Sequence, residues 1–257
     1  MVARWAYEAM AVYQFKNNEF EKQFFAFDRD RKYYAWKKDY WLKDLKVRSS
    51  DAQKMLNQPS SAQPLAHNLG ILRNELTKES ERIPNLKINA LQSLQPGVVD
   101  AGALQSIDST LVMLDRYYVD NYNSTNDQKE MLIAELTATP EKRAAYLQQQ
   151  DEHYNENLEE FVTNKNDLKK IVEANQELIQ KQNPIYLDPE GGFFDAHYYA
   201  PSKQLLGKRI STLSGNILVI WLMSLGLTVL LVFDGLRKAL DFLGKLSMPL
   251  ISGKGRN

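Results

Sequence analysis

An uncharged apolar run near the carboxyl end constrains the fold of this chain more than any other feature. Residues Ile217 to Phe233 read ILVIWLMSLGLTVLLVF, with one serine and one threonine as mildly polar interruptions. A helix in a globular core does not need to be apolar on every face, whereas a helix surrounded by lipid does. The run alone covers about 25 Å as a helix, and the flanking residues 213–216 and 234–236 bring it to the roughly 30 Å thickness of a hydrocarbon core.

We therefore predict one transmembrane helix with its cytoplasmic extension over residues 206–243, followed by a basic tail over 244–257. The helix that contains the span is expected to begin near Lys203. The lipid bilayer is the first expected partner. The residues expected to lie within the span are Ile217, Trp221, Leu225, Leu230 and Phe233.

Charge and cysteine content exclude several classes of function. The 257 residues include 32 Lys and Arg and 32 Asp and Glu, so no net positive charge favours binding to nucleic acid. The absence of cysteine excludes disulfides, thiol catalysis and cysteine-ligated metals. The start MVARWAYEAMAV is not a signal peptide, because Glu8 interrupts it and no apolar core follows. A chain of this length alone should keep its large region in the cytosol, unless it belongs to a longer polytopic protein.

The hydrophobic spacing of the rest of the chain predicts a mainly α fold. Residues 1–20 suggest an amphipathic helix, and 21–205 a helical extramembrane domain built as a hairpin or bundle. Shorter helices are expected at 51–57, 63–82 and 102–120.

A long helix is expected from Thr139 to Gln182, with Thr139 as its cap and Pro140 at its first position. Its apolar positions follow three- and four-residue steps, as in a coiled coil, but Lys165 and Asn175 interrupt that seam. We therefore expect an intramolecular helical hairpin rather than a coiled-coil dimer.

Aromatic residues gather in two stretches. Residues 21–47 are rich in aromatic and basic side chains, which suit a membrane interface and ordinary helix packing equally well. Residues 193–201, including Tyr198 and Tyr199, precede the span directly, where an interfacial aromatic belt would lie.

No recognisable catalytic constellation is present in the sequence. The three histidines are far apart, and His153 near Glu156 is best explained as part of a solvated helix face. Asp188 and Glu190 could bind a cation in their turn, but they lack the ligand ladder of an EF-hand. A phosphate-binding glycine loop is missing. We expect no enzyme activity, catalytic residue, cofactor or metal in this chain.

Both ends resemble a known family. The segment from Ala3 to Met10 (ARWAYEAM), followed by QFKNNEF up to Phe20, resembles the stretch after the fifth membrane helix of White-like (G-subfamily) ABC exporters. The closing VIWLMSLGLTVLLVFDGLRKALDF resembles the sixth and last membrane helix of that permease. The loop between these two helices would be enlarged, as in bacterial, Bacteroidota-like fusions of ATPase and permease. The resemblance covers about a quarter of the chain.

This resemblance implies the carboxy-terminal fragment, or a split subunit, of a type-two ABC permease in a bacterial inner membrane. Its partners would be the rest of the permease, an ATPase domain that binds ATP and Mg²⁺, and a second copy of the full transporter. The large domain would be periplasmic or extracellular, and the basic tail would keep the carboxyl end cytoplasmic. Residues 1–20 would lie at the outer membrane interface, with Arg4 and Glu8 paired. The interfacial residues would be Arg4, Trp5, Tyr7, Glu8, Phe20, Tyr198 and Tyr199.

The alternative is a tail-anchored protein with a single span and no transport role. In that case the helix from Thr139 to Gln182 would bind a partner, and the large region would stay in the cytosol. An enzyme with an unrecognised site between Asp188 and His197 is a more distant possibility.

Overall fold

The computed structural model describes residues 2–56, 58, 62–189, 191–234 and 237. It confirms the mainly helical fold and one carboxy-terminal helix, α8 (Thr212–Val232), long and apolar enough to cross a membrane. Only 11% of the most apolar window of α8 is buried inside the protein, so α8 is not a core helix. The predicted start near Lys203 is wrong, because α8 begins at Thr212, after a strand. The helix end expected at residue 243 and the basic tail 244–257 lie outside the described residues.

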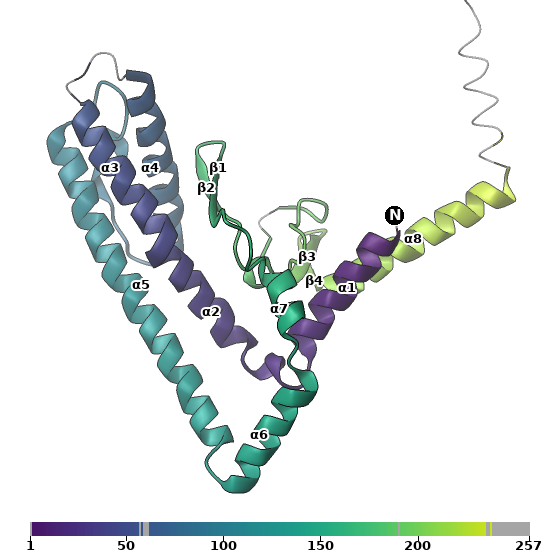
Figure 1. Ribbon diagram of the computed structural model, residues 1–257. Helices are drawn as coiled ribbons and strands as arrows, with labels where there is room; N and C mark the ends of the chain where they lie inside the picture. Colours follow the sequence, from purple (N-terminus) through teal and green to yellow (C-terminus); the bar gives the residue numbers. More distant parts are fainter. Residues whose placement is uncertain (1, 57, 59–61, 190, 235–236, 238–257) are drawn as a thin grey trace, which may run out of the picture.

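The helices before α8 account for most of the fold (Figure 1). They are α1 (Val2–Asn17), the short helix η1 (Glu21–Gln23), α2 (Phe25–Trp36), the π-helical turn η2 (Lys37–Trp41), α3 (Leu42–Met55), α4 (Ala62–Arg82), the short helix η4 (Asn89–Ser93), α5 (Ala101–Leu136), α6 (Pro140–His153), α7 (Glu156–Thr163) and the short helix η5 (Pro184–Tyr186).

Residues 25–136, here called the arm, pack α2, η2 and α3 against α4 and α5 (Figure 1). The N-cap Asp100 accepts a hydrogen bond from the backbone N–H of Ala103 at 2.7 Å and starts α5. Along α5 the buried residues recur at three- and four-residue steps, so that one stripe faces α3 and α4. These residues are Leu104, Ile107, Leu111, Leu114 and Tyr118. The expected helix over 63–82 is confirmed as α4, while the expected helix over 102–120 is longer and ends at Leu136.

The predicted helix from Thr139 to Gln182 is wrong beyond His153. Its start is confirmed, since Thr139 caps α6 and Pro140 follows at the first turn. Asn155 then caps the separate helix α7, and Asn164 ends α7 in the left-handed conformation. The apolar residues further along do not form a seam: Leu168 is 96% exposed.

Two antiparallel β-hairpins lie in segments that were expected to be helical. The first falls within the predicted helix from Thr139 to Gln182, and the second falls at the predicted start of the last helix near Lys203. Strands β1 (Ile171–Ala174) and β2 (Glu177–Gln180) pair around a turn in which Asn175 and Gln176 both have positive φ. Strands β3 (Ser202–Leu205) and β4 (Lys208–Ser211) form the second hairpin, directly before α8.

The arm and the α1–α8 pair diverge, so the described molecule has the outline of a V with α6 at its closed end (Figure 1). A second, smaller core joins α1 to α7 and η5 through Val12, Phe15, Val162, Ile185 and Tyr186. The chain bends at 18–24, here called the elbow. In the aromatic stretch 21–47, Phe24, Trp36 and Trp41 are buried, which agrees with ordinary helix packing.

Candidate functional site beside the apolar helix α8

The two ends of the chain meet at a buried polar cluster, here called the junction, formed by Glu8, Lys203 and Asn216. The ammonium of Lys203 lies 2.9 Å from the Glu8 carboxylate, and both side chains are 3% exposed. The amide of Asn216 donates to the same carboxylate oxygen at 2.9 Å and to the carbonyl of Trp5 at 3.0 Å. Helices α1 and α8 run antiparallel here (Figure 1), so the junction ties α1, β3 and the first turns of α8 together.

Aromatic rings enclose the junction. The Lys203 ammonium lies 4.5 Å from the ring centroid of Trp5 and 5.5 Å from that of Phe193. Trp5 and Phe193 stack, with centroids 6.2 Å apart. The charge of Lys203 is therefore balanced by one carboxylate and two ring faces rather than by water.

The predicted pair between Arg4 and Glu8 is wrong. The Arg4 guanidinium instead lies over the ring of Tyr198, 5.5 Å from its centroid, and Glu8 turns inward to Lys203. The physical reason is that α1 buries the face that carries Glu8 against α8, where only a charged partner offsets the loss of water.

The other predicted interfacial residues differ in their position and in their exposure to solvent. Tyr7 is 52% exposed on α1, while Tyr198 and Tyr199 are half-buried in the loop before β3. Phe20 lies elsewhere, buried at the elbow among Phe24, Tyr146 and Tyr154. The residues predicted to lie within the span are all exposed on the protein surface: Ile217, Trp221, Leu225, Leu230 and Phe233, at 43%, 69%, 62%, 45% and 65%.

Sequence reasoning missed Lys203 and Asn216 as partners of Glu8, because 195 and 208 positions separate them from it. One signal was available: Glu8 lies four residues before Val12 and seven before Phe15, so it shares the helix face that α1 buries. A carboxylate on a buried helix face requires a partner.

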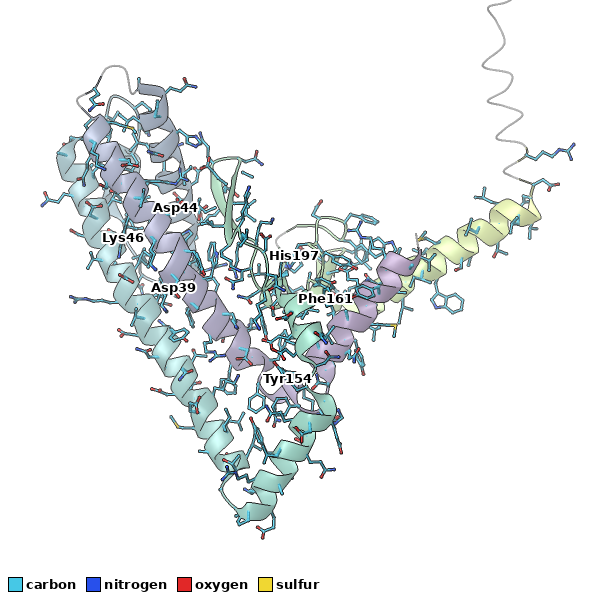
Figure 2. The ribbon with its side chains drawn as sticks, in the orientation of Figure 1. Asp39, Asp44, Lys46, Tyr154, Phe161 and His197 are labelled. Atoms are coloured by element: carbon cyan, nitrogen blue, oxygen red, sulfur yellow. The ribbon has the colours of Figure 1, made fainter. Side chains whose placement is uncertain are left out.

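A cleft of about 980 Å³ separates the arm from the region around α7. Its arm side includes Tyr33, Trp36 and Arg82, and its other side includes Tyr186 and His197. Phe161 and His197 also line this cleft, and Figure 2 shows them on the side of α7, away from Asp39 on the arm. The charged groups of the cleft are largely paired within the protein. Lys78 contacts Glu177 at 2.6 Å, and Asp188 contacts Arg209 at 2.8 Å.

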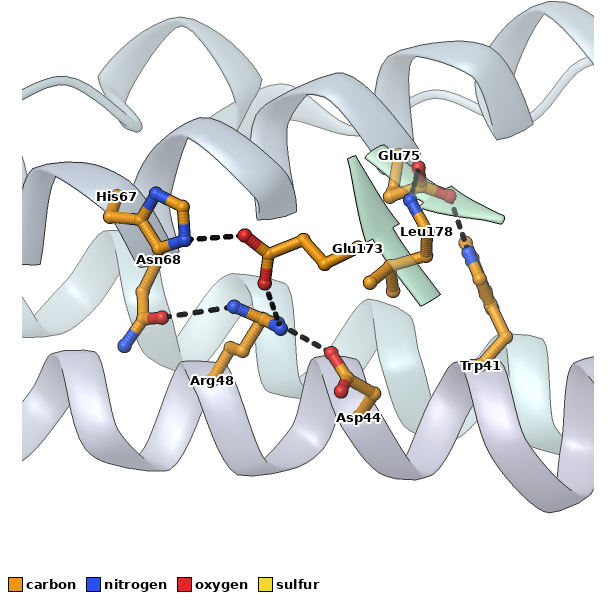
Figure 3. A network of polar contacts seen from close by, with 8 residues as sticks. All are labelled: Trp41, Asp44, Arg48, His67, Asn68, Glu75, Glu173 and Leu178. Atoms are coloured by element: carbon orange, nitrogen blue, oxygen red, sulfur yellow. Dashed lines mark hydrogen bonds and ion pairs between the residues drawn. The ribbon is translucent and has the colours of Figure 1, made fainter. Parts of the chain in front are cut away.

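The β1–β2 hairpin crosses the cleft and is bound to the arm by polar contacts (Figure 3). Glu173 lies between His67 and Arg48, at 2.6 and 2.8 Å. Glu75 accepts hydrogen bonds from the backbone N–H of Leu178 at 2.8 Å and from the indole of Trp41 at 2.6 Å. These contacts hold the hairpin against the arm, in the space between the two sides of the V.

The π-helical turn η2 directs Lys37 into the arm, where it pairs with Glu79. Its ammonium also lies 3.6 Å from the ring centroid of Trp41. Burial lowers the pKa of Lys37, while the Glu79 carboxylate opposes that shift. The Tyr118 hydroxyl donates to Glu79, and burial raises the pKa of this tyrosine above its usual range. The network is satisfied internally, so it specifies packing rather than exposing a reactive group.

At the elbow, burial and the neighbouring carboxylates of Asp28 and Glu159 raise the pKa of Glu21 to about 7, while Lys129 opposes the shift. Lys129 is itself engaged with Asp28 at 2.7 and 2.8 Å. Glu21 is therefore the described carboxylate with the clearest reason to bind a proton near neutral pH.

No group of three or more His, Asp or Glu side chains in the described residues is arranged to hold a metal ion. His197 is hydrogen-bonded to the carbonyl of Pro184 at 2.8 Å, and Asp188 to Arg209. Glu190, the other residue of the possible cation site, lies outside the described residues. Comparison with protein-family models, with curated proteins and with solved structures gives no match to this chain.

Proposed function

We propose that this chain is the carboxy-terminal part of a type-two ABC exporter permease. In this proposal α8 is the last membrane helix, residues 21–205 form a domain outside the membrane, and the carboxyl end is cytoplasmic. An ATPase domain elsewhere in the transporter binds ATP and Mg²⁺, and two copies of the transporter assemble.

The observation that carries the proposal is the antiparallel pairing of α1 with α8 (Figure 1). These are the two segments that resemble consecutive parts of one permease, and they pack together although about 200 residues separate them in the chain. A motion of α8 would reach α1 and β3 through the hydrogen bond of Asn216 to Glu8 and the buried ion pair of Glu8 with Lys203, which cannot be separated without a large cost.

The tail-anchored alternative relied on a continuous helix from Thr139 to Gln182 for partner recognition. That segment is divided into α6, α7 and a hairpin, so no specific observation favours this alternative.

Topology tests the proposal directly. The natural chain has no cysteine, so Ser124→Cys, at an exposed position of α5, provides a single thiol in the large domain. A membrane-impermeant maleimide should label Ser124→Cys in intact cells. Labelling only after lysis would place the domain in the cytosol, overturn the exporter proposal and support the tail-anchored alternative. Sequencing the DNA directly upstream is an independent check, which should reveal five apolar helices and a phosphate-binding loop in frame.

A further inference from the structure

Two adjacent phenylalanines lie at the centre of a tight turn in the loop before β3. The backbone N–H of Asp195 donates to the carbonyl of Gly192 at 3.1 Å, and the Asp195 carboxylate accepts from the N–H of Gly192 at 2.9 Å. Phe193 and Phe194 are therefore the two central residues of a closed turn, where polar residues are the usual occupants.

Phe193 fixes the position of this turn against α8. A Cβ atom added to Gly215 would lie 2.9 Å from the Phe193 ring, so the ring rests directly on the α8 backbone. The ring of Trp5 stacks against the same Phe193 ring. Gly215 precedes the apolar run at Ile217 by two residues, which is about 3 Å along the helix axis.

Phe194 points away from this packing. Its side chain is 81% exposed, although its ring meets that of Phe193 edge to face with centroids 5.3 Å apart. The turn therefore fixes the exposed ring of Phe194 in position, close to the point where α8 leaves the domain. The side chain of an exposed Phe has no polar atom that could form a hydrogen bond with water, so its exposure to water is unfavourable.

We propose that Phe194 inserts into the boundary between headgroups and hydrocarbon of the bilayer that α8 crosses. The inference rests on the proposed membrane function and adds a second point of contact with lipid, independent of the span. The occupant is lipid rather than protein because Phe193, whose ring meets that of Phe194, rests on Gly215 of α8, two residues before the exposed apolar run that includes Trp221 at 69% exposure. With α8 and Phe194 both in the bilayer, the domain has a fixed rotation about the helix axis.

The absence of cysteine makes the test clean, since each single-cysteine variant carries one label. Phe194→Cys, Leu168→Cys and Leu225→Cys are labelled with an environment-sensitive fluorophore. The proteins are then reconstituted in vesicles of phosphatidylethanolamine and phosphatidylglycerol. Leu168 is the matched control, an apolar residue 96% exposed beside β1, and Leu225 reports the span. Quenching is measured with iodide in the buffer and with lipids that carry a nitroxide near the headgroup or deep in the chain.

The label at Phe194→Cys should be quenched by the shallow lipid nitroxide and show several-fold less iodide quenching than the label at Leu168→Cys. If it behaves like the label at Leu168→Cys while that at Leu225→Cys is protected, the inference is overturned and the membrane span stands. Protection from iodide without lipid quenching would indicate a protein contact, such as a second copy, and would also overturn it. If the label at Leu225→Cys is open to iodide, α8 is not in lipid, and the proposed function fails with the inference.

Discussion

Removing one charge of the junction should greatly lower the free energy of unfolding. Removing the second charge as well should restore most of it. Lys203→Met leaves the Glu8 carboxylate, 3% exposed, with Asn216 as its remaining donor. Breaking a buried ion pair in this way costs about 3–5 kcal/mol, because the remaining charge stays out of water without its partner. In a domain of this size that loss corresponds to a fall in Tm of about 6–20 °C.

The double variant Glu8→Leu/Lys203→Met removes both charges, so it should recover most of the lost stability. Lys46→Met is the matched control. The Lys46–Asp115 pair has a similar length, 2.7 Å, but both side chains are 40% exposed, so the expected loss is within about 1 kcal/mol.

The free energy of unfolding is measured in detergent micelles by urea titration, followed by circular dichroism. Equal losses in Lys203→Met and Lys46→Met, or a double variant no more stable than the Lys203→Met variant, would refute the assignment of the junction as a buried, mutually dependent pair.

Three further predictions concern other parts of the molecule. The folded protein binds the Glu21 proton more tightly than the unfolded chain, because the pKa rises from 4.5 to about 7. The contribution of Glu21 to stability therefore falls as the pH rises through that window, and Glu21→Gln should be more stable by up to about 3 kcal/mol above it, in urea titrations at several pH values. Tyr118→Phe leaves Glu79 without the tyrosine hydroxyl and should lower the free energy of unfolding by about 1–3 kcal/mol in the same titration. Leu206 has φ of +50° and is 96% exposed, so Leu206→Asn should relieve strain and raise stability by about 1 kcal/mol, measured by thermal melting.

Each of these has a clear contrary result. A pH profile that is the same in the natural chain and in Glu21→Gln would mean that Glu21 does not titrate in that window. Tyr117→Phe, at a neighbouring exposed position, should have little effect, and a loss as large as that of Tyr118→Phe would argue against the buried hydrogen bond. A destabilised Leu206→Asn would mean that the exposed leucine makes a contact outside the described residues.

Local signals predicted part of this fold correctly. The all-round apolar composition of 217–233 identified α8, and Thr139-Pro140 identified the start of α6, because each signal lies within the segment whose structure it determines. The pattern failed between 155 and 182. Apolar residues at three- and four-residue steps also occur in short helices and strands, and the left-handed asparagines at 164 and 175 decided the outcome.

The candidate site was less accessible to sequence reasoning than the fold. The partners of Glu8 come from the far end of the chain, and helical spacing suggested the local residue Arg4 instead. Burial decided between the two, and burial depends on which face of α1 contacts α8. The exposed Phe194 required the turn geometry, which brings Phe193 back onto α8.

The meeting of the two chain ends has an evolutionary consequence. The polypeptide leaves α1 after Asn17, packs on it again at α7 and η5, and reaches α8 through Phe193 and β3, so the arm is a single excursion that begins and ends beside the α1–α8 pair. Doubling the length of such an excursion costs only about 0.6 kcal/mol in closure entropy. Versions with a much shorter or longer excursion can therefore keep the same helix pair, and the arm is free to diverge in size and sequence while the membrane-proximal scaffold is retained.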